Sequence, residues 1–378
     1  MAVKQPGGNY SFFKEVPSFD NVGYPIAEIF QDGSFNITKH PGTGGLVSKG
    51  TVTAQLLYEI SSPAYVNPDV VSHFDTLKIE ELEKDKVHVS GCRGSSPPKD
   101  HKVCINLAGG FRNGMEIILT GLDIEEKAKV FTEVLFNSVG GQEQFDEVFI
   151  ELQRTDKENP TTNEQAMASL VISVKSSNQE LVGRLFSAKI IELALANIPG
   201  FFAESGPKSS GPVIIYWPAL IDSKYITEKV HIDGKEIEVM PTSQLDYEEI
   251  YYQREPISID DVEISDQKEI YFGDLFGTRS GDKGGCANLG VWAKNNLSYS
   301  FLYNFLTIEK LKELLPDLSE YKIERFELPN INSLNFYIHD ILEDGVSSNN
   351  RKDGQAKSLG EYLRVKKILV PDSILLET

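Results

Sequence analysis

Residues 246–267 divide the chain into two unequal parts. This stretch is strongly acidic, contains Pro256 and shows no sustained hydrophobic periodicity. A segment of this kind between two periodic regions is typical of a linker, because it carries too little apolar surface to build a core of its own. We therefore predict a larger domain over 1–255 and a smaller domain over 268–378.

Short strand and helix patterns alternate on both sides of this linker. The mixture predicts an α/β to α+β fold, in which a larger mixed α/β domain is followed by a small α+β sandwich. Asp123 and Glu126 form a capping-box pattern at one helix start. Helical patterns cover 51–60, 123–140, 178–196, 307–315 and 355–363. Strand patterns cover 26–30, 35–38, 77–82, 87–90, 103–107, 116–120, 145–152, 230–232, 236–239, 269–275, 289–293, 322–328, 334–338 and 365–370, and glycine loops are expected at 40–45, 109–114 and 278–288.

The charge balance and the cysteine count exclude several classes of partner. The chain has 37 Lys and Arg against 56 Asp and Glu, a net charge of −19, and no long basic cluster, so we expect no nucleic-acid partner. Three cysteines do not form a disulfide framework, which favours a reducing compartment. No apolar run approaches the length of a membrane span and the N-terminus has no apolar signal core, so we expect a cytoplasmic protein with no membrane partner.

The first segment that could carry chemistry is 38–45, which leads into the predicted helix near Thr51. Glycines let a backbone approach a ligand closely, and amides at a helix start attract anions. The order of residues matches neither a phosphate-binding Walker loop nor a dinucleotide fingerprint, so nucleotide hydrolysis and a nicotinamide site are disfavoured here. The alternative is a tight turn with a structural histidine. In the functional interpretation His40 is an acid or base, and the ligand contacts are Lys39, Gly42, Gly44 and Gly45.

The second segment is 106–113, where Arg112 and Asn113 follow two glycines. An arginine can bind a carboxylate or phosphate through two parallel hydrogen bonds, and Asn113 adds a neutral donor. The alternative is a hairpin whose arginine is merely solvated, and the sequence alone slightly favours that alternative.

The third segment is 278–288, which gathers two cations, an acid, a hydroxyl and an amide among three glycines. We predict that Arg279 and Asn288 bind an anionic substrate while Asp282 or Lys283 moves a proton. A self-neutralising turn of ion pairs explains the same residues equally well. Cys286 is a candidate nucleophile beside them, although a single loop cysteine is more often a spectator.

A fourth segment runs from His339 and Asp340 to Lys357. Adjacent residues on a strand point to opposite faces, so His339 and Asp340 do not form a catalytic dyad there. Metal ligation is disfavoured as well, because His101 and Cys104 have only Cys92 as a nearby soft partner. We therefore predict no metal site.

Several of these motifs together resemble the acyclic terpene utilisation (AtuA) family. The matching motifs of the larger part are GGNYSFF from Gly7, TKHPGTGG from Thr38, TVTAQLLYEI from Thr51, NPD from Asn67, GGFRN from Gly109 and GLDIE from Gly121. The smaller part resembles the ferredoxin-fold module often attached to that family, through RSGDKG from Arg279, LPN from Leu328, LNF from Leu334 and GQAKSLG from Gly354.

This resemblance implies an AtuA-like core domain over 1–255 and an AtuA-like ferredoxin-fold domain over 268–378. It also implies a role in the catabolism of branched or terpenoid carboxylic acids, beside acyl-CoA carboxylases and dehydrogenases. Family members usually carry a further α/β portion before the GGN motif. We therefore expect 7–38 to be poorly covered, with a separate N-terminal α/β portion or carboxylase subunits as partners.

The leading hypothesis is an enzyme, or the C-terminal portion of one, that acts on a small anionic carboxylate or its CoA thioester. Hydration, lyase cleavage and isomerisation need only acids, bases and anion-binding groups, and no cofactor fingerprint is found. The alternatives are a scaffold for an acyl-CoA carboxylase or dehydrogenase and a binding module without turnover; we also expect a homo-oligomer. An enzyme predicts that at least two of His40, Arg112 and the Arg279 loop converge on one cleft, whereas a scaffold predicts dispersal and an exposed apolar patch.

Overall fold

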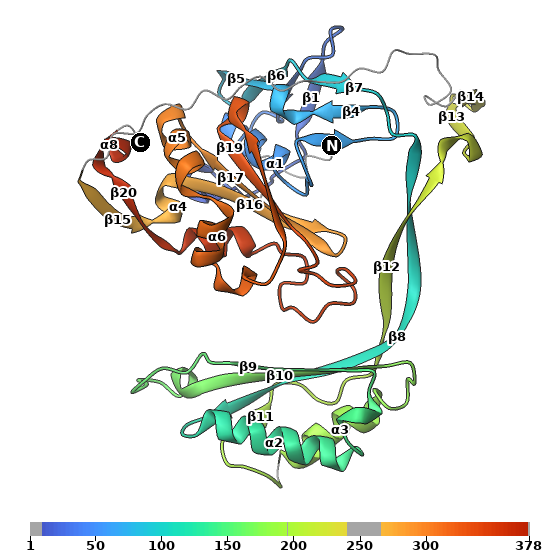
Figure 1. Ribbon diagram of the computed structural model, residues 1–378, viewed down its shortest axis with the longest axis vertical. Helices are drawn as coiled ribbons and strands as arrows, with labels where there is room; N and C mark the ends of the chain where they lie inside the picture. The colour runs from blue at the N-terminus through green and yellow to red at the C-terminus, as the bar shows by residue number, and fades with distance from the viewer. Residues whose placement is uncertain (1–9, 195, 240–265, 377–378) are drawn as a thin grey trace. The chain divides into compact units, whose positions relative to one another are not determined.

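The computed structural model describes residues 10–194, 196–239 and 266–376, which form a sheet-rich mixture of strands and helices (Figure 1). The mixed α/β fold class expected from the sequence is confirmed. Two compact units are present: unit 1 draws on 1–104, 218–346 and 353–378, and unit 2 on 105–217 and 347–352. The boundary between these units does not fall at the predicted linker, because residues before the linker belong to both units. Residues 246–265 of the predicted linker lie outside the described residues.

The N-terminal part of unit 1 consists of small antiparallel sheets around one helix. A four-stranded sheet has the order β1-β2-β6-β5 and a three-stranded sheet the order β3-β4-β7. Helix α1 begins after Ser48, which exchanges side-chain and backbone hydrogen bonds with Thr51 and so satisfies amides at the helix start. The elements are β1 (Ile26–Ile29), β2 (Phe35–Thr38), α1 (Lys49–Leu56), β3 (Ala64–Val66), β4 (Val71–His73), β5 (Lys78–Glu83), β6 (Lys86–Ser90) and β7 (Arg93–Ser95).

The C-terminal part of unit 1 is an antiparallel sheet in the order β16-β17-β19-β18, with a separate pair β15-β20. Alternate residues such as Leu289 and Phe336 point to one face and pack with the helices into a buried core. The elements are β15 (Gln267–Tyr271), α4 (Phe272–Leu275), β16 (Phe276–Lys283), β17 (Cys286–Ala293), α5 (Asn296–Phe305), α6 (Ile308–Leu314), β18 (Ile323–Leu328), β19 (Ser333–Ile338), α7 (Leu359–Arg364), β20 (Lys367–Pro371) and α8 (Asp372–Leu375).

The other face of this sheet is covered by the end of α1 and the residues that follow it. A Cβ atom added at Gly290 would lie 2.6 Å from the Cβ of Leu57, and one at Gly281 would lie 2.8 Å from the Tyr58 ring. The predicted loop 278–288 is therefore wrong. These glycines belong to the hairpin β16–β17, where the lack of a side chain lets another segment pack directly on the strands.

A buried cluster joins the two parts of unit 1. Trp292, Leu328 and Ile331 from the C-terminal part pack with residues from the N-terminal part, among them Leu57 and Ile60. The N-terminal and C-terminal parts of unit 1 therefore share one core, although more than 100 residues of unit 2 separate them in sequence.

Unit 2 is an antiparallel sheet in the order β11-β8-β10-β9, with β12 also paired to β8. Helices α2 and α3 cover one face of the sheet (Figure 1), and their apolar residues, including Phe131 and Phe186, form its core. The elements that lie wholly or partly in unit 2 are β8 (Asp100–Thr120), α2 (Ile124–Ser138), β9 (Glu147–Gln153), β10 (Met167–Ser176), α3 (Arg184–Leu193), β11 (Phe201–Ala203) and β12 (Gly211–Asp222).

Strand β8 corrects the prediction of two strands separated by a loop at 109–114. It is continuous over 21 residues. A Cβ atom at Gly109 would lie 2.8 Å from the Ile215 side chain, and one at Gly114 would lie 2.9 Å from the Ile172 carbonyl oxygen. These glycines thus allow close approach of neighbouring chain segments rather than a turn.

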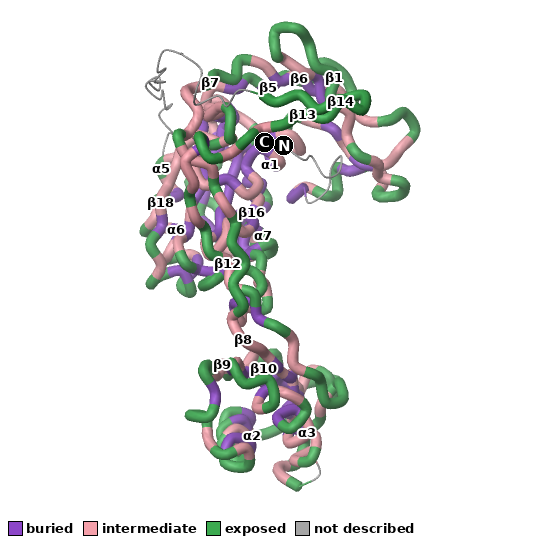
Figure 2. The backbone as a smooth tube through the Cα atoms, turned by 90° about the vertical axis from the view of Figure 1, so that its right-hand side faces the viewer, coloured by how far each residue is buried: buried purple, intermediate pink, exposed green. Residues whose placement is uncertain are grey.

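Other boundaries also differ from the prediction. The helix expected over 178–196 is limited to α3, the strand expected over 269–275 divides into β15 and α4, and α5 was not predicted. Asp123 precedes α2 in a left-handed conformation with φ of 57° and makes no side-chain cap hydrogen bond, so the capping box is wrong. The hairpin β13 (Glu228–Ile232) and β14 (Lys235–Val239) is confirmed, and it is exposed on both faces (Figure 2).

Candidate functional site

A pocket of about 220 Å³ opens in unit 1 beside strand β16. It combines two cations, Arg279 and Lys357, with hydroxyl groups and one acidic residue. The N-terminal and C-terminal parts of unit 1 both contribute to its wall, so neither part alone builds it. Its lining residues are Tyr10, Ser11, Phe13, Thr278, Arg279, Ser280, Lys357, Gly360 and Glu361.

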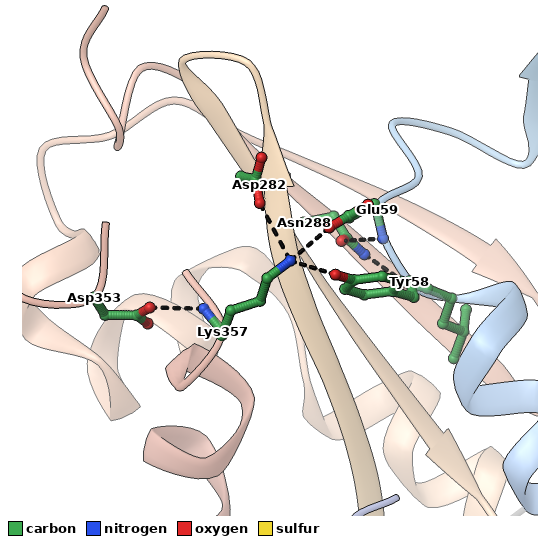
Figure 3. A network of polar contacts seen from close by, with 7 residues as sticks. Tyr58, Glu59, Asp282, Asn288, Asp353 and Lys357 are labelled. Atoms are coloured by element: carbon green, nitrogen blue, oxygen red, sulfur yellow. Dashed lines mark hydrogen bonds and ion pairs between the residues drawn. The ribbon is translucent and has the colours of Figure 1, made fainter. Parts of the chain in front are cut away.

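Lys357 is the centre of a polar network at this pocket (Figure 3). Its ammonium group donates to the Tyr58 hydroxyl, to Glu59 Oε1 at 2.5 Å and to Asp282 Oδ1 at 3.2 Å. Burial lowers the pKa of Lys357, but the hydrogen bonds to Glu59 and Tyr58 outweigh it, and the net pKa lies above the ordinary value. Lys357 therefore carries its charge at neutral pH.

Arg279 lies over the face of the Tyr58 ring, with its guanidinium carbon 3.9 Å from the ring centroid. Burial lowers the pKa of Arg279, and the nearby Tyr58 and Glu59 partly offset this. Burial also raises the pKa of Tyr58, and its hydrogen bond with Glu59 raises this pKa further. The site thus pairs a partly buried cation with a tyrosine that stays protonated at neutral pH.

A buried asparagine pair fixes the chain segment that carries Tyr58 and Glu59. Asn288 donates to the Leu57 carbonyl at 2.6 Å and to Asn335 Oδ1 at 2.9 Å, and it accepts from the Glu59 amide at 2.8 Å. Glu59 itself has a φ of 57°, in the left-handed region. The sequence predicts that Asn288 binds substrate, and this prediction is wrong. Asn288 is fully buried, and its amide group holds the backbone instead.

Asp282 and Lys283 are neighbours on β16, so their side chains point to opposite faces of the sheet. Asp282 reaches Lys357, whereas the Lys283 ammonium lies 5.4 Å from the centroid of the Tyr65 ring. Of the two predicted catalytic residues in this segment, the structure connects only Asp282 to the Lys357 network.

The loop 38–45 makes its contacts elsewhere in unit 1. Lys39 donates to the Thr43 carbonyl at 2.6 Å and pairs with Asp85 at 3.5 Å. The Gly44 amide donates to the Asp20 carbonyl and the Gly45 amide to the Ser18 carbonyl. The prediction that these amides are open to a ligand is therefore wrong. Gly42 and His40 are exposed, and a catalytic role for His40 stays a prediction.

The start of α1 is also satisfied by the chain itself. The Lys49 amide donates to Glu81 at 2.6 Å and the Thr51 amide donates to Ser48 at 3.2 Å. The expected contribution of these amides to an anion site is therefore not available at Lys49 and Thr51.

Arg112 and Asn113 belong to unit 2 and have partners there. Arg112 donates to the Asn349 carbonyl at 2.8 Å. Asn113 is buried and donates to the Gly183 and Lys208 carbonyls at 3.3 and 2.9 Å. Arg112 is predicted to bind a carboxylate or phosphate, but in the structure its guanidinium group donates to a main-chain carbonyl.

Tyr58, Glu59 and Lys357 were not among the predicted site residues. Tyr58 and Lys357 are 299 positions apart, so no local pattern joins them. The sequence signal for Lys357 was the density of polar residues in 351–357 together with the motif at Gly354. That signal did not indicate Tyr58 and Glu59 as the partners of Lys357.

A second pocket of about 290 Å³ in unit 1 shares Tyr10 with the first. Its carboxylates already have partners: Glu15 pairs with Lys294 at 2.7 Å, and Glu81 accepts from the Lys49 amide. The Trp292 ring is stacked on Tyr10 and is 3 % exposed, so its face is not free for a ligand.

Within 10–194, 196–239 and 266–376, no three His, Cys, Asp or Glu side chains are arranged to hold a metal ion. Over the same ranges, no helix has the length and apolar character needed to cross a membrane.

Two family models match the chain. The model described as acyclic terpene utilisation family protein AtuA matches residues 3–232, and the model described as AtuA ferredoxin-like domain matches residues 271–369. No curated protein and no solved structure matches. The two matched ranges supply the two halves of the Lys357 network, Tyr58 and Glu59 from the first and Asp282 and Lys357 from the second.

Proposed function

The chain belongs to the acyclic terpene utilisation family AtuA, which supports a role in terpene catabolism, and from this premise we propose a specific activity for the Arg279 pocket. Unit 1 binds a branched or terpenoid carboxylic acid, or its CoA thioester, and transfers a proton on it. Hydration, lyase cleavage and isomerisation are the reactions that such a site can perform.

The observation that carries this proposal is the pairing of Arg279 and Lys357 on one pocket wall. The chain as a whole has a net charge of −19, so a local concentration of positive charge is needed to hold an anion. Arg279 is held against Tyr58, which orients its planar guanidinium group before a ligand arrives. A carboxylate fits such a group through two parallel hydrogen bonds.

The proton transfer is assigned to the Lys357 network. Lys357 lines the pocket in its charged form and can donate a proton to a carbon or oxygen that becomes negative during reaction. Asp282, at 3.2 Å from Lys357, is an acceptor for a proton removed from substrate or from water. Tyr58 and Glu59 hold the ammonium group in place from the other side.

A thermal-shift titration with isovalerate and with isovaleryl-CoA tests this assignment. A ligand that binds the folded state stabilises it by about 2.7 kcal/mol at 100 times its Kd. We expect a rise in Tm for the wild type and for Arg184→Gln, a matched loss of charge at an exposed residue of unit 2, but not for Arg279→Gln. An unchanged rise in Arg279→Gln contradicts the proposal.

One observation favours a scaffold function as a second candidate. Four apolar side chains, Val230, Ile232, Ile237 and Val239, occupy one face of the hairpin β13–β14 and are 37 to 55 % exposed. We propose that this face is the contact surface of a cytoplasmic complex, formed with further copies of the chain or with acyl-CoA carboxylase subunits. Sedimentation velocity of the wild type and Ile237→Lys, alone and with a purified acyl-CoA carboxylase, tests it, and identical sedimentation throughout contradicts it.

A further inference from the structure

A second cluster of reactive side chains lies at the tip of the hairpin β16–β17, outside the Arg279 pocket. Lys283 and Cys286 are direct partners across a two-residue turn, so their side chains point to the same face of the sheet. Asn288 pairs with Tyr337 on the next strand, which places Tyr337 diagonally beside Cys286 on that face. The hairpin tip thus presents a thiol between an amine and a phenol.

The contacts of this cluster are specific. The Tyr337 hydroxyl is hydrogen-bonded to Cys286, and its ring lies edge-on to His339 at 4.9 Å between centroids. His339 Nε2 in turn lies 2.6 Å from Glu324 Oε1. The phenol ring therefore packs against a histidine that is itself held by Glu324.

The amine across the turn from Cys286 belongs to Lys283, which is partly buried and lies near a second lysine. Burial lowers the pKa of Lys283 and the charge of nearby Lys102 lowers it further, while the charges of Glu59 and Asp282 partly offset this. An amine of this kind can take a proton from a neighbouring thiol, and the resulting positive charge stabilises the thiolate.

From this geometry we propose that Cys286 is an acyl acceptor, which takes a branched acyl group from a thioester with Lys283 as proton acceptor and Tyr337 as hydrogen-bond donor. The class of acyl donor rests on the proposed function, whereas the reactivity of the thiol depends only on the hairpin tip. Cys286 is partly exposed, which leaves it open to a donor, and it forms no disulfide.

The step is balanced without an oxidant or reductant. Lys283 takes the thiol proton, and the Cys286 sulfur attacks the thioester carbonyl carbon. The bond from that carbon to the donor sulfur then breaks. The departing thiolate receives the proton from Lys283, which leaves an acylated protein and a free donor thiol.

The test incubates the full chain with S-isovaleryl-N-acetylcysteamine at pH 7 and maps the acyl group by peptide mass spectrometry. The three free cysteines provide internal controls, since Cys92 and Cys104 are both more exposed than Cys286. We expect acylation of Cys286 ahead of the other two, its loss in Cys286→Ser, and its retention in Cys92→Ser and Cys104→Ser.

Lys283→Met separates activation from simple accessibility. A pKa rise of one unit in the thiol reduces the thiolate present at pH 7 about tenfold, so we expect at least that loss in initial rate. The matched control Lys268→Met changes an exposed lysine of β15 and keeps the rate. The loss should shrink as the pH approaches 10, which a misfolded hairpin does not reproduce.

Two outcomes overturn the proposal. One is labelling of the three cysteines in order of their exposure, and the other is an unmodified Cys286 while N-acetylcysteine exchanges with the same thioester. Arg279→Gln keeps the two hypotheses distinct, because it should abolish carboxylate binding in the pocket and leave acylation at Cys286 intact.

Discussion

The loop 38–45 and the hairpin β16–β17 both combine glycines with cations, but they use the glycines in opposite ways. In the loop, Gly44 and Gly45 bring the backbone onto 18–20, and their amides are consumed there. In the hairpin, Gly281 and Gly290 leave the sheet flat, so that Leu57 and Tyr58 pack on it. The amides of the loop are used by a neighbouring segment, whereas the hairpin assembles charged side chains from two distant parts of the chain.

The difference shows that a glycine-rich motif does not by itself indicate a backbone cradle for an anion. What decides is whether the amides of the motif find partners in the same chain. In unit 1 the candidate anion site is formed by side chains, Arg279 and Lys357, and the glycines of the hairpin provide only the room for their neighbours.

Removal of the asparagine that joins the two parts should have the largest effect. Asn288→Ala removes the hydrogen bonds to the Leu57 carbonyl and from the Glu59 amide, and the loss of one such partner costs about 1–3 kcal/mol. We expect a loss of about 3 kcal/mol in the free energy of unfolding, measured by urea titration. A loss below 0.5 kcal/mol contradicts the assignment of Asn288 to the backbone.

Alanine at single glycines sharpens the comparison next. Gly290→Ala places a Cβ 2.6 Å from the Cβ of Leu57, and overpacking of this kind costs about 1–3 kcal/mol. Gly42→Ala meets no atom within 4 Å, and its φ of 74° costs about 1 kcal/mol. We expect Gly290→Ala to lower both stability and ligand binding, and Gly42→Ala to lower stability alone. Equal binding by both variants breaks the comparison.

Changes to the charged residues of the hairpin should affect chemistry more than stability. Asp282→Asn removes the acceptor beside Lys357, and Lys283→Ala removes a side chain that lies over Tyr65. We expect Asp282→Asn to abolish turnover of the acid or thioester found by thermal shift, with the Tm within a few degrees of the wild type. Full turnover in the double variant eliminates this segment from the mechanism.

Stability should also depend on pH through Lys357. Its folded-state pKa is raised above the ordinary 10.5, so its contribution is complete below that pH and is lost as the pH rises through the folded-state pKa. Urea titrations between pH 8 and 11.5 should show a steeper alkaline loss for the wild type than for Lys357→Met. Parallel curves indicate that the network does not favour the charged amine.

His40→Asn should have the smallest effect. His40 is exposed, and its carbonyl, which the substitution keeps, accepts from the Thr43 hydroxyl at 2.7 Å. We expect a change within about 0.5 kcal/mol in the free energy of unfolding and an unchanged thermal shift with ligand. Lost turnover with retained binding restores His40 as a catalytic acid or base.

Local chemistry made parts of this fold predictable from the sequence. Asp32-Gly33 and Asp233-Gly234 each predicted a hairpin from turn preference, and the apolar spacing from Ile124 to Leu135 predicted α2. Continuous strands through glycines, as in β8, were not predictable, because the reason for each glycine is a neighbouring segment. The site was only half predictable, since Arg279 and Asp282 stand in a dense motif while Tyr58 and Glu59 reach it through tertiary packing.

Isothermal titration of isovalerate into the wild type, Arg279→Gln and Lys39→Gln tests the central claim most directly, since the two variants remove one cation each from the hairpin and from the loop. The account predicts that Arg279→Gln loses the binding heat and that Lys39→Gln keeps the wild-type Kd within about threefold, because Lys39 is engaged with Asp85 and Thr43. Binding that survives in Arg279→Gln and disappears in Lys39→Gln would place the anion site in the loop 38–45 and contradict the account.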